Sequence, residues 1–188
     1  MSLHRAFDAA FPPPTAPPGC SVAIGYIGGA RATNVWTLND WKRFAYLRQI
    51  PVYVPDFGTE DPKIAAETAC AAMLKLGWAP DQTPNRAVVC DLETAAERAW
   101  YAQFAYTVAH HGFVSVAYGS LSTVFENAAA DVIVAAWDGS PVLLDGQTVH
   151  GHQYQAGVPF AGVPFAEVPF AEVTAMMSTY VDGSLVST

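Results

Sequence analysis

The feature that most constrains the fold of this chain is an alternation of short apolar segments with helical segments along its first two thirds. Runs of apolar and β-branched residues predict strands at residues 3–7, 21–27, 50–54, 86–93, 113–117 and 132–137. Apolar residues at helical spacing predict helices at residues 37–48, 61–76, 95–111 and 121–128. Strands that alternate with helices are typical of a parallel sheet, because parallel neighbours need a crossover connection.

Two further strands are expected at residues 142–144 and 148–153, and residues 147–154 are expected to close the sheet. A set of about eight strands predicts a TIM-type (β/α)8 barrel, which usually takes about 200–250 residues. This chain has 188 residues. Helices must therefore be missing, and the prolines at 12–18 exclude one after the first strand, while residues 138–147 also leave no room for one. The sequence predicts an α/β fold: a TIM-type barrel that is short and irregular, with several helices missing or reduced.

Residues 158–173 repeat the unit Val-Pro-Phe-Ala-Gly/Glu with a period of five. Proline at every fifth position forbids a helix interior and removes donors from a sheet ladder. We expect a polyproline-like wrap that lays Phe160, Phe165 and Phe170 on the barrel. The alternative is an exposed aromatic strip for a partner or for self-association. The predicted division is a barrel domain at 1–157, followed by the repeat and tail at 158–188, packed on the barrel or extending from it.

Composition narrows the function classes. The net charge of −8 argues against a nucleic-acid partner, which asks for a basic face. No apolar run reaches the roughly 20 residues of a membrane span. The three cysteines have no metal-like spacing, and His150 and His152 lack a third ligand, so neither a metal nor a cofactor is predicted. Met1–Leu3 leads directly into the first apolar segment, so we expect no signal peptide here, and either a cytosolic protein or one whose export signal was removed.

Two acids end the apolar run at residues 86–93, Arg-Ala-Val-Val-Cys-Asp-Leu-Glu. In an extended strand Asp91 and Glu93 share one face, with Cα atoms about 6.5–7 Å apart, while Cys90 and Leu92 point the other way. Two carboxylates on one face repel each other, so one of them keeps its proton to higher pH, as general acid catalysis requires. The alternative is a strand end with two solvated acids in a loop.

Acids and aromatics also occupy most of the other predicted strand ends, where a barrel collects its function. They are Asp8, Asp56, Tyr118, Trp137 and Tyr154, and the amide Gln153 stands beside Tyr154. Aromatic faces stack on sugar rings, and carboxylates act at a glycosidic oxygen, so this combination favours a carbohydrate site. Each residue also has a plainer interpretation: Tyr118 and Trp137 as core aromatics, and Asp56 after Pro55 as a turn residue.

Several of these residues belong to short motifs that resemble those of a known family. The order of Asp8, Gly25-Tyr26-Ile27-Gly28-Gly29, Val88-Val89-Cys90-Asp91-Leu92-Glu93, Tyr118-Gly119-Ser120, Ala135-Ala136-Trp137 and His152-Gln153-Tyr154 resembles a glycoside-hydrolase-like family of actinobacterial and phage-associated domains. That family is similar to the family 25 glycoside hydrolases, the lysozyme-like muramidases. The resemblance covers about residues 3–157 and has its most specific parts in Asp-x-Glu and Gln-Tyr.

The resemblance implies that Glu93 is the general acid, that Asp91 is its electrostatic partner and that Asp8 lines the site. It also implies substrate contacts by Tyr26, Asp56, Tyr118, Trp137, Gln153 and Tyr154. A further acid is expected after the last strand. Here the chain departs from the family, because the Val-Pro-Phe repeat follows and offers only Glu167 or Glu172.

Three hypotheses follow. The first is a domain that binds, and in its active form hydrolyses, a β-linked amino-sugar polymer such as peptidoglycan. The second is a non-catalytic glycan-binding or cell-wall-associated module that keeps the pocket without the last acid. The third is an interaction protein that uses residues 158–173 to bind a partner or a second copy.

Overall fold

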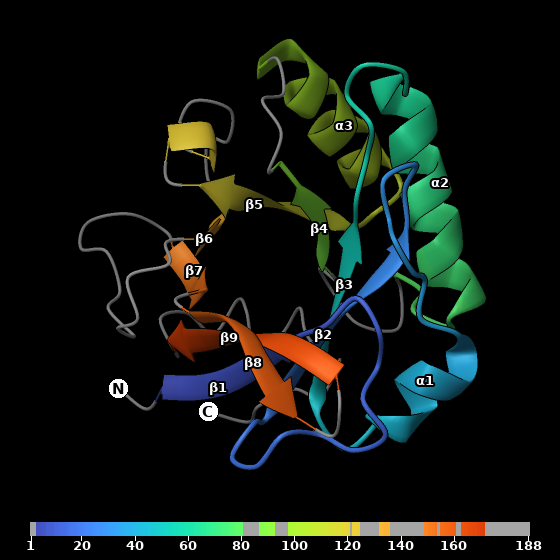
Figure 1. Ribbon diagram of the computed structural model, residues 1–188. Helices are drawn as coiled ribbons and strands as arrows, with labels where there is room; N and C mark the ends of the chain where they lie inside the picture. The colour runs from blue at the N-terminus through green and yellow to red at the C-terminus, as the bar shows by residue number, and fades with distance from the viewer. Residues whose placement is uncertain are drawn as a thin grey trace, which may run out of the picture.

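The computed structural model describes residues 3–80, 87–92, 98–120, 122–124, 132–135, 149–153, 155–160 and 163–171. Consecutive strands pair in parallel from β1 to β7 and curl into a barrel wall (Figure 1). These strands are β1 Leu3–Asp8, β2 Val22–Gly28, β3 Arg48–Tyr53, β4 Ala87–Asp91, β5 Val114–Ser120, β6 Val132–Ala135 and β7 Val149–Gln153. The predicted α/β fold, a short and irregular TIM-type barrel, is confirmed.

The barrel is closed by β9 (Val163–Ala171), which runs antiparallel between β1 and β7. It pairs with β1 along the whole of that strand, and β8 (Gln155–Phe160) forms a hairpin with it. The prediction that residues 147–154 close the sheet is wrong. β7 occupies that segment as the seventh strand, and the chain turns back once more before it reaches β1.

The Val-Pro-Phe repeat therefore forms paired strands, and not the polyproline-like wrap expected from its prolines. Pro159 and Pro164 lie opposite each other in the hairpin. Two residues without an N–H donor thus share one position of the ladder instead of interrupting two. The boundary predicted after residue 157 falls within β8, which belongs to the same sheet as β1. The placement of the three phenylalanine side chains lies outside what the structure describes.

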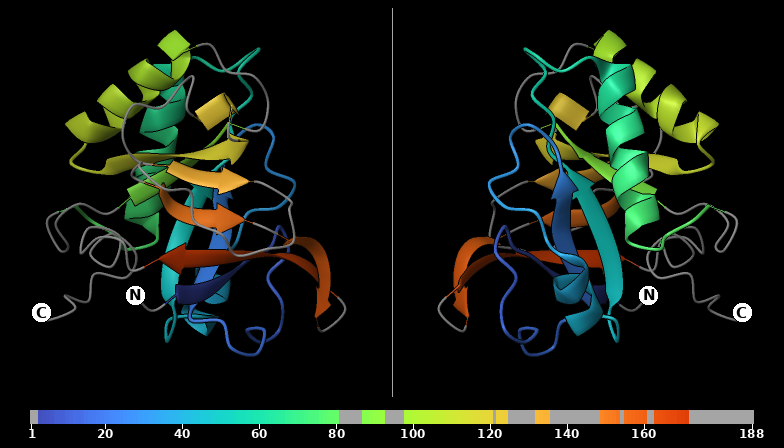
Figure 2. Two further views of the ribbon diagram at one scale, coloured as in Figure 1. Left: turned by 90° about the vertical axis from the view of Figure 1, so that its left-hand side faces the viewer. Right: turned by 90° about the vertical axis from the view of Figure 1, so that its right-hand side faces the viewer.

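The helices α1 Leu38–Arg43, α2 Pro62–Lys75 and α3 Arg98–His110 pack outside the barrel wall. Figure 2 shows α2 and α3 side by side on one side of the sheet. Thr37 is the N-cap of α1, and Asp40 completes a capping box. The helix predicted to reach residue 48 ends at Arg43, because residues 44–47 turn directly into β3. Residues 136–148, where a further strand was expected, lie outside the described residues.

Side-chain alternation along the strands divides the apolar residues between two cores. One core fills the barrel interior and includes Ile24, Val52 and Val89. The other lies between the sheet and the helices and includes Val88 and Cys90. A strand buried on both faces must be apolar throughout, and β4 has that pattern up to its last residue, Asp91.

An aromatic cluster covers the part of the barrel where the first helix is missing, as the prolines at 12–18 predicted. Phe7, Trp36 and Phe44 are each almost fully buried, and the Phe7 and Phe44 rings lie 5.4 Å apart. The Trp36 indole donates a hydrogen bond to the Ala9 carbonyl at 2.9 Å, and Arg43 donates one to the Pro13 carbonyl at 3.0 Å. These bonds hold the proline loop against the barrel, so that it replaces the helix as cover.

Candidate functional site

Residues near the carboxyl ends of four parallel strands meet in one cavity inside the barrel. Asp8 comes from β1, Tyr26 from β2, Asp91 from β4 and Tyr118 from β5, and all four line this cavity. Its apolar floor is formed by Ile24, Val52, Val89 and Ile133. Along each strand every second side chain points into the barrel, and each of these polar residues lies at such a position. The barrel therefore brings together side chains that are far apart in sequence.

Asp91 is 6% exposed, and its register partner on β5 is Tyr118. Its neighbours Cys90 and Leu92 belong to the core on the other side of the wall. The expected alternation of faces at this strand end is therefore present. The Leu92 amide donates to the Tyr118 carbonyl at 2.6 Å, so the chain stays attached to β5 where it leaves β4. Burial and the neighbouring Asp91 raise the pKa of the Cys90 thiol, which makes it a poor nucleophile.

A chain of hydrogen bonds crosses the barrel beside this cavity. The Tyr118 hydroxyl donates to Oε1 of Gln153 at the end of β7. Nε2 of Gln153 then donates to Oδ2 of Asp8 at 3.1 Å. Three of the predicted site residues, separated by up to 145 positions in sequence, are thus joined in one network.

The cavity is small and acidic. It encloses about 10 Å³, which is room for about one water molecule. Its described lining has two carboxyl groups and two phenol hydroxyls, and no lysine, arginine or histidine. A cavity of this size holds no sugar ring, so a sugar would have to bind beyond the strand ends.

Asp56 is not among the residues that line this cavity. Its carboxylate accepts hydrogen bonds from the Gly58 amide at 3.2 Å and the Thr59 hydroxyl at 3.0 Å, as in the turn interpretation of this residue. Glu93, Trp137 and Tyr154 lie outside the described residues, and so does Glu172. Glu167 lies on β9 opposite Phe7, and Ala166 lies opposite Asp8.

Glu60 belongs to the same region, although no role is predicted for it above. Its carboxylate accepts from the Tyr53 hydroxyl at 2.7 Å and from the Asp56 amide at 2.8 Å. Its carbonyl accepts from the Trp100 indole at 2.8 Å. Glu60 therefore ties the loop after β3 to α3. In the sequence, the only indication of this role is that Glu60 lies four residues after Asp56, close enough to bond to the backbone of the turn.

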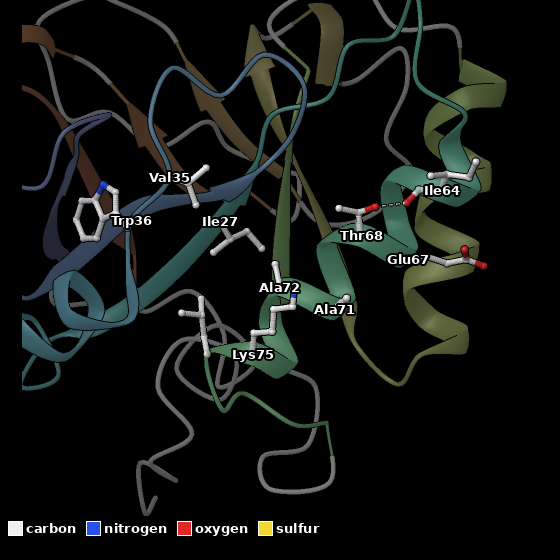
Figure 3. A pocket seen from close by; sticks show the side chains of 10 residues that line it. Ile27, Val35, Trp36, Ile64, Glu67, Thr68, Ala71, Ala72 and Lys75 are labelled. Carbon is white, nitrogen blue, oxygen red and sulfur yellow. Dashed lines mark hydrogen bonds between the residues drawn. The ribbon is translucent and has the colours of Figure 1, made fainter.

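A second hollow of about 580 Å³ lies outside the barrel, between α2 and the chain after β2 (Figure 3). Its lining is mostly apolar, with Ile27, Val35 and Ala72 among its members. The Glu67 carboxylate there is 48% exposed and lies 3.9 Å from the Lys63 ammonium. The described lining thus offers no converging acids, and the barrel interior is the better candidate for chemistry.

Within the described ranges, no group of three or more histidine, cysteine or acidic residues is placed to hold a metal ion. Over the same ranges, no helix has the length and apolar character needed to span a membrane.

Comparison with solved structures identifies the fold. The muramidase from Trichobolus zukalii superposes with a TM-score of 0.71 at 11% identity, over 96% of this chain and 100% of that chain. The catalytic domain of endolysin ply40 from bacteriophage P40 of Listeria monocytogenes gives 0.68 at 12%, over 97% and 98%. The Tat-secreted protein Rv2525c of Mycobacterium tuberculosis, in complex with L-tartrate, gives 0.64 at 15%, over 92% and 97%.

No family model matches this chain, and no curated protein matches it by sequence. The likeness is therefore one of fold. At that level, the predicted relation to the lysozyme-like muramidases is confirmed.

Proposed function

We propose that this chain is a glycoside-hydrolase-like domain that binds and hydrolyses a β-linked amino-sugar polymer such as peptidoglycan. The observation that carries the proposal is the meeting of Asp8, Asp91, Tyr26 and Tyr118 in one cavity at the carboxyl end of the barrel. Fold alone does not assign an activity, so the weight rests on this site. The muramidase and endolysin neighbours support the same class of substrate.

In the proposed mechanism, Glu93 protonates the leaving glycosidic oxygen as general acid. Asp91, which lines the cavity and lies two positions before Glu93 in the sequence, assists the general acid. Two neighbouring carboxylates repel each other, so one of them keeps its proton to higher pH. Asp8 supplies negative charge near the oxocarbenium-like centre that develops on the sugar. Tyr26, Tyr118, Trp137 and Tyr154 are proposed to contact the sugar rings.

The test compares the parent protein with Glu93→Gln on purified cell wall. We expect the parent to release saccharides with new reducing ends and Glu93→Gln to lose at least about 100-fold in rate, the usual contribution of a general acid. Glu67→Gln, the same substitution on the exposed face of α2, is the matched control and should keep the parent rate. A Glu93→Gln protein that releases product as fast as the parent would contradict the catalytic role.

A non-catalytic glycan-binding module is the second candidate, and one observation favours it. The resemblance implies a further acid after the last strand, but on β9 Ala166 lies opposite Asp8 and Glu167 lies opposite Phe7. Isothermal titration with soluble muropeptides, followed by mass spectrometry of the mixture, separates the two candidates. Binding without any cleavage product supports the module, and product formation supports the hydrolase.

Self-association through residues 158–173 remains a separate proposal. The backbone of β9 pairs on both sides within the barrel, with β1 on one and with β7 and β8 on the other. Among the described pairings β8 contacts β9 alone, so an added strand would bind at β8. Analytical ultracentrifugation over a range of concentrations measures this directly, and a monomer throughout would remove the proposal.

A further inference from the structure

Gln153 is only 1% exposed and is more deeply buried than Tyr118, which is 8% exposed. A side chain this deeply buried does not reach a polymer that binds above the strand ends. Its two polar atoms are both engaged inside the barrel, one with Tyr118 and the other with Asp8. Any effect of Gln153 on the site must therefore pass through these two residues.

The direction of the Gln153 amide is linked to the charge of Asp8. With Nε2 toward Asp8, the amide donates to a carboxylate oxygen, and such a bond is strongest when the acid is ionised. The reversed amide would set two acceptor oxygens against each other unless Asp8 carried a proton. The observed direction also leaves Oε1 as acceptor, so the Tyr118 hydroxyl must donate to it.

We propose that Gln153 is a positioning residue that holds Asp8 as the ionised carboxylate of the site and sets the direction of the Tyr118 hydroxyl proton. The catalytic meaning of this role rests on the proposed function. The titratable groups that line the cavity with Asp8 among the described residues are Asp91, Tyr26 and Tyr118. With Asp8 held ionised, the proton needed for acid catalysis is left to the other acids of the proposed site, among them Asp91.

Two substitutions test the role by different routes. Gln153→Met keeps much of the side-chain volume and removes both hydrogen bonds. Gln153→Glu keeps the shape of the side chain but places a second carboxyl group beside Asp8. Two adjacent carboxyl groups do not both ionise easily, because their negative charges repel each other. Gln49 is the matched control: it is also a buried glutamine on a barrel strand, and its amide donates to the Trp41 carbonyl at 2.5 Å, away from the cavity. Gln49→Met and Gln49→Glu therefore make the same changes outside the site.

The primary measurement is the titration of the Asp8 carboxyl carbon by NMR in protein labelled with ¹³C-aspartate, with Asp8→Asn used to assign the signal. We expect the Asp8 midpoint to rise by about one pH unit in Gln153→Met, because a hydrogen bond to the charged form is lost. In Gln153→Glu the added like charge should raise it further. The Gln49 variants should leave it unchanged.

An Asp8 midpoint that is the same in the parent and in the Gln153 variants would overturn the inference. If Gln153→Met does not fold, Gln153→Glu decides the matter, since its protonated form retains a donor for Asp8 and an acceptor for Tyr118. Cell-wall hydrolysis is a second measurement: in Gln153→Met the acid limb of the pH–rate profile should move up with the Asp8 midpoint. NMR needs no turnover, so an inactive parent with the expected Asp8 shift contradicts only the proposed function.

Discussion

Cys90 and Asp91 are consecutive residues of β4 whose side chains lie on opposite faces of the barrel wall. Cys90 is fully buried in the core beneath the helices, whereas Asp91 lines the cavity inside the barrel. The wall at this point is one strand thick. It therefore separates the apolar core under the helices from the polar cavity inside the barrel. Side chains on the two faces should differ in reactivity.

The cysteines should differ in reactivity. Burial raises the pKa of Cys70 to about 12 and that of Cys90 well above its ordinary value, whereas Cys20 is partly exposed. The thiolate is the reactive form, so we expect iodoacetamide at pH 8 to label at most Cys20 in the native protein. Unfolding in guanidinium should expose all three to labelling, as counted by mass spectrometry. Rapid labelling of Cys90 in the folded protein would contradict the packing of β4 beneath the helices.

Removal of β9 should open the barrel. A chain that ends at residue 161 lacks the strand that pairs with β1 from Leu3 to Asp8. It would leave β1 as an exposed edge, and exposed edges promote aggregation. We expect this chain to lose its cooperative thermal transition and to aggregate on size-exclusion chromatography. A chain that ends at residue 173 keeps β9 and is the matched control, and it should unfold cooperatively. Equal behaviour of the two chains would show that β9 is not needed for closure.

Gly25 should not tolerate a larger side chain. A Cβ atom at this position would lie 2.4 Å from the ring of Trp36, which is 1% exposed and bonded to the Ala9 carbonyl. The indole has no space to yield, so Gly25→Ala should lower the free energy of unfolding by about 1–3 kcal/mol, the usual cost of overpacking. Gly58→Ala is the control, because its nearest neighbour would be 3.5 Å away. Urea denaturation measures both, and equal losses would contradict the contact.

Tyr53 should make stability fall at alkaline pH. Its side chain is 1% exposed, and burial followed by the bond to Glu60 raises its pKa above the ordinary value of about 10. Above pH 10 the unfolded state releases this proton and the folded state retains it, so stability falls as pH rises. Tyr53→Phe loses the hydrogen bond to Glu60 and should be less stable at pH 7 by about 1–2 kcal/mol.

The difference in free energy of unfolding between the parent and Tyr53→Phe should narrow by about 1 kcal/mol between pH 9 and pH 11. Only the parent loses the stabilisation that comes from the raised pKa of Tyr53. Chemical denaturation at each pH measures it. The other titrating groups are the same in both proteins and cancel in the comparison. A difference that stays constant with pH would mean that Tyr53 titrates normally in the folded state.

Much of the barrel could be predicted because its causes are local. β-branched apolar runs require extended backbone, and the period of two assigns Asp91 to one face and Cys90 to the other. Thr37 and Asp61 mark the starts of α1 and α2 through hydrogen bonds to backbone amides only two or three residues away. The prolines at 12–18 likewise exclude a helix by their own covalent structure.

The closure of the barrel could not be predicted in this way. Proline weakens any local preference for a strand, yet the repeat is extended because β1 and β7 would otherwise present open edges to each other. The same holds for Asp56: its position after a strand suggested a site residue, and its turn uses the carboxylate instead.

The sequence alone specifies which residues form the strands, which face each side chain takes and which polar groups end the strands, since these depend on chain chemistry within a few residues. The closure of the sheet by the antiparallel β9 and the position of Gln153 between Tyr118 and Asp8 depend instead on the assembled barrel. That contact spans 145 positions. It exists because the curvature of the sheet brings the ends of β5, β7 and β1 around one axis, and curvature is a property of all the strands together.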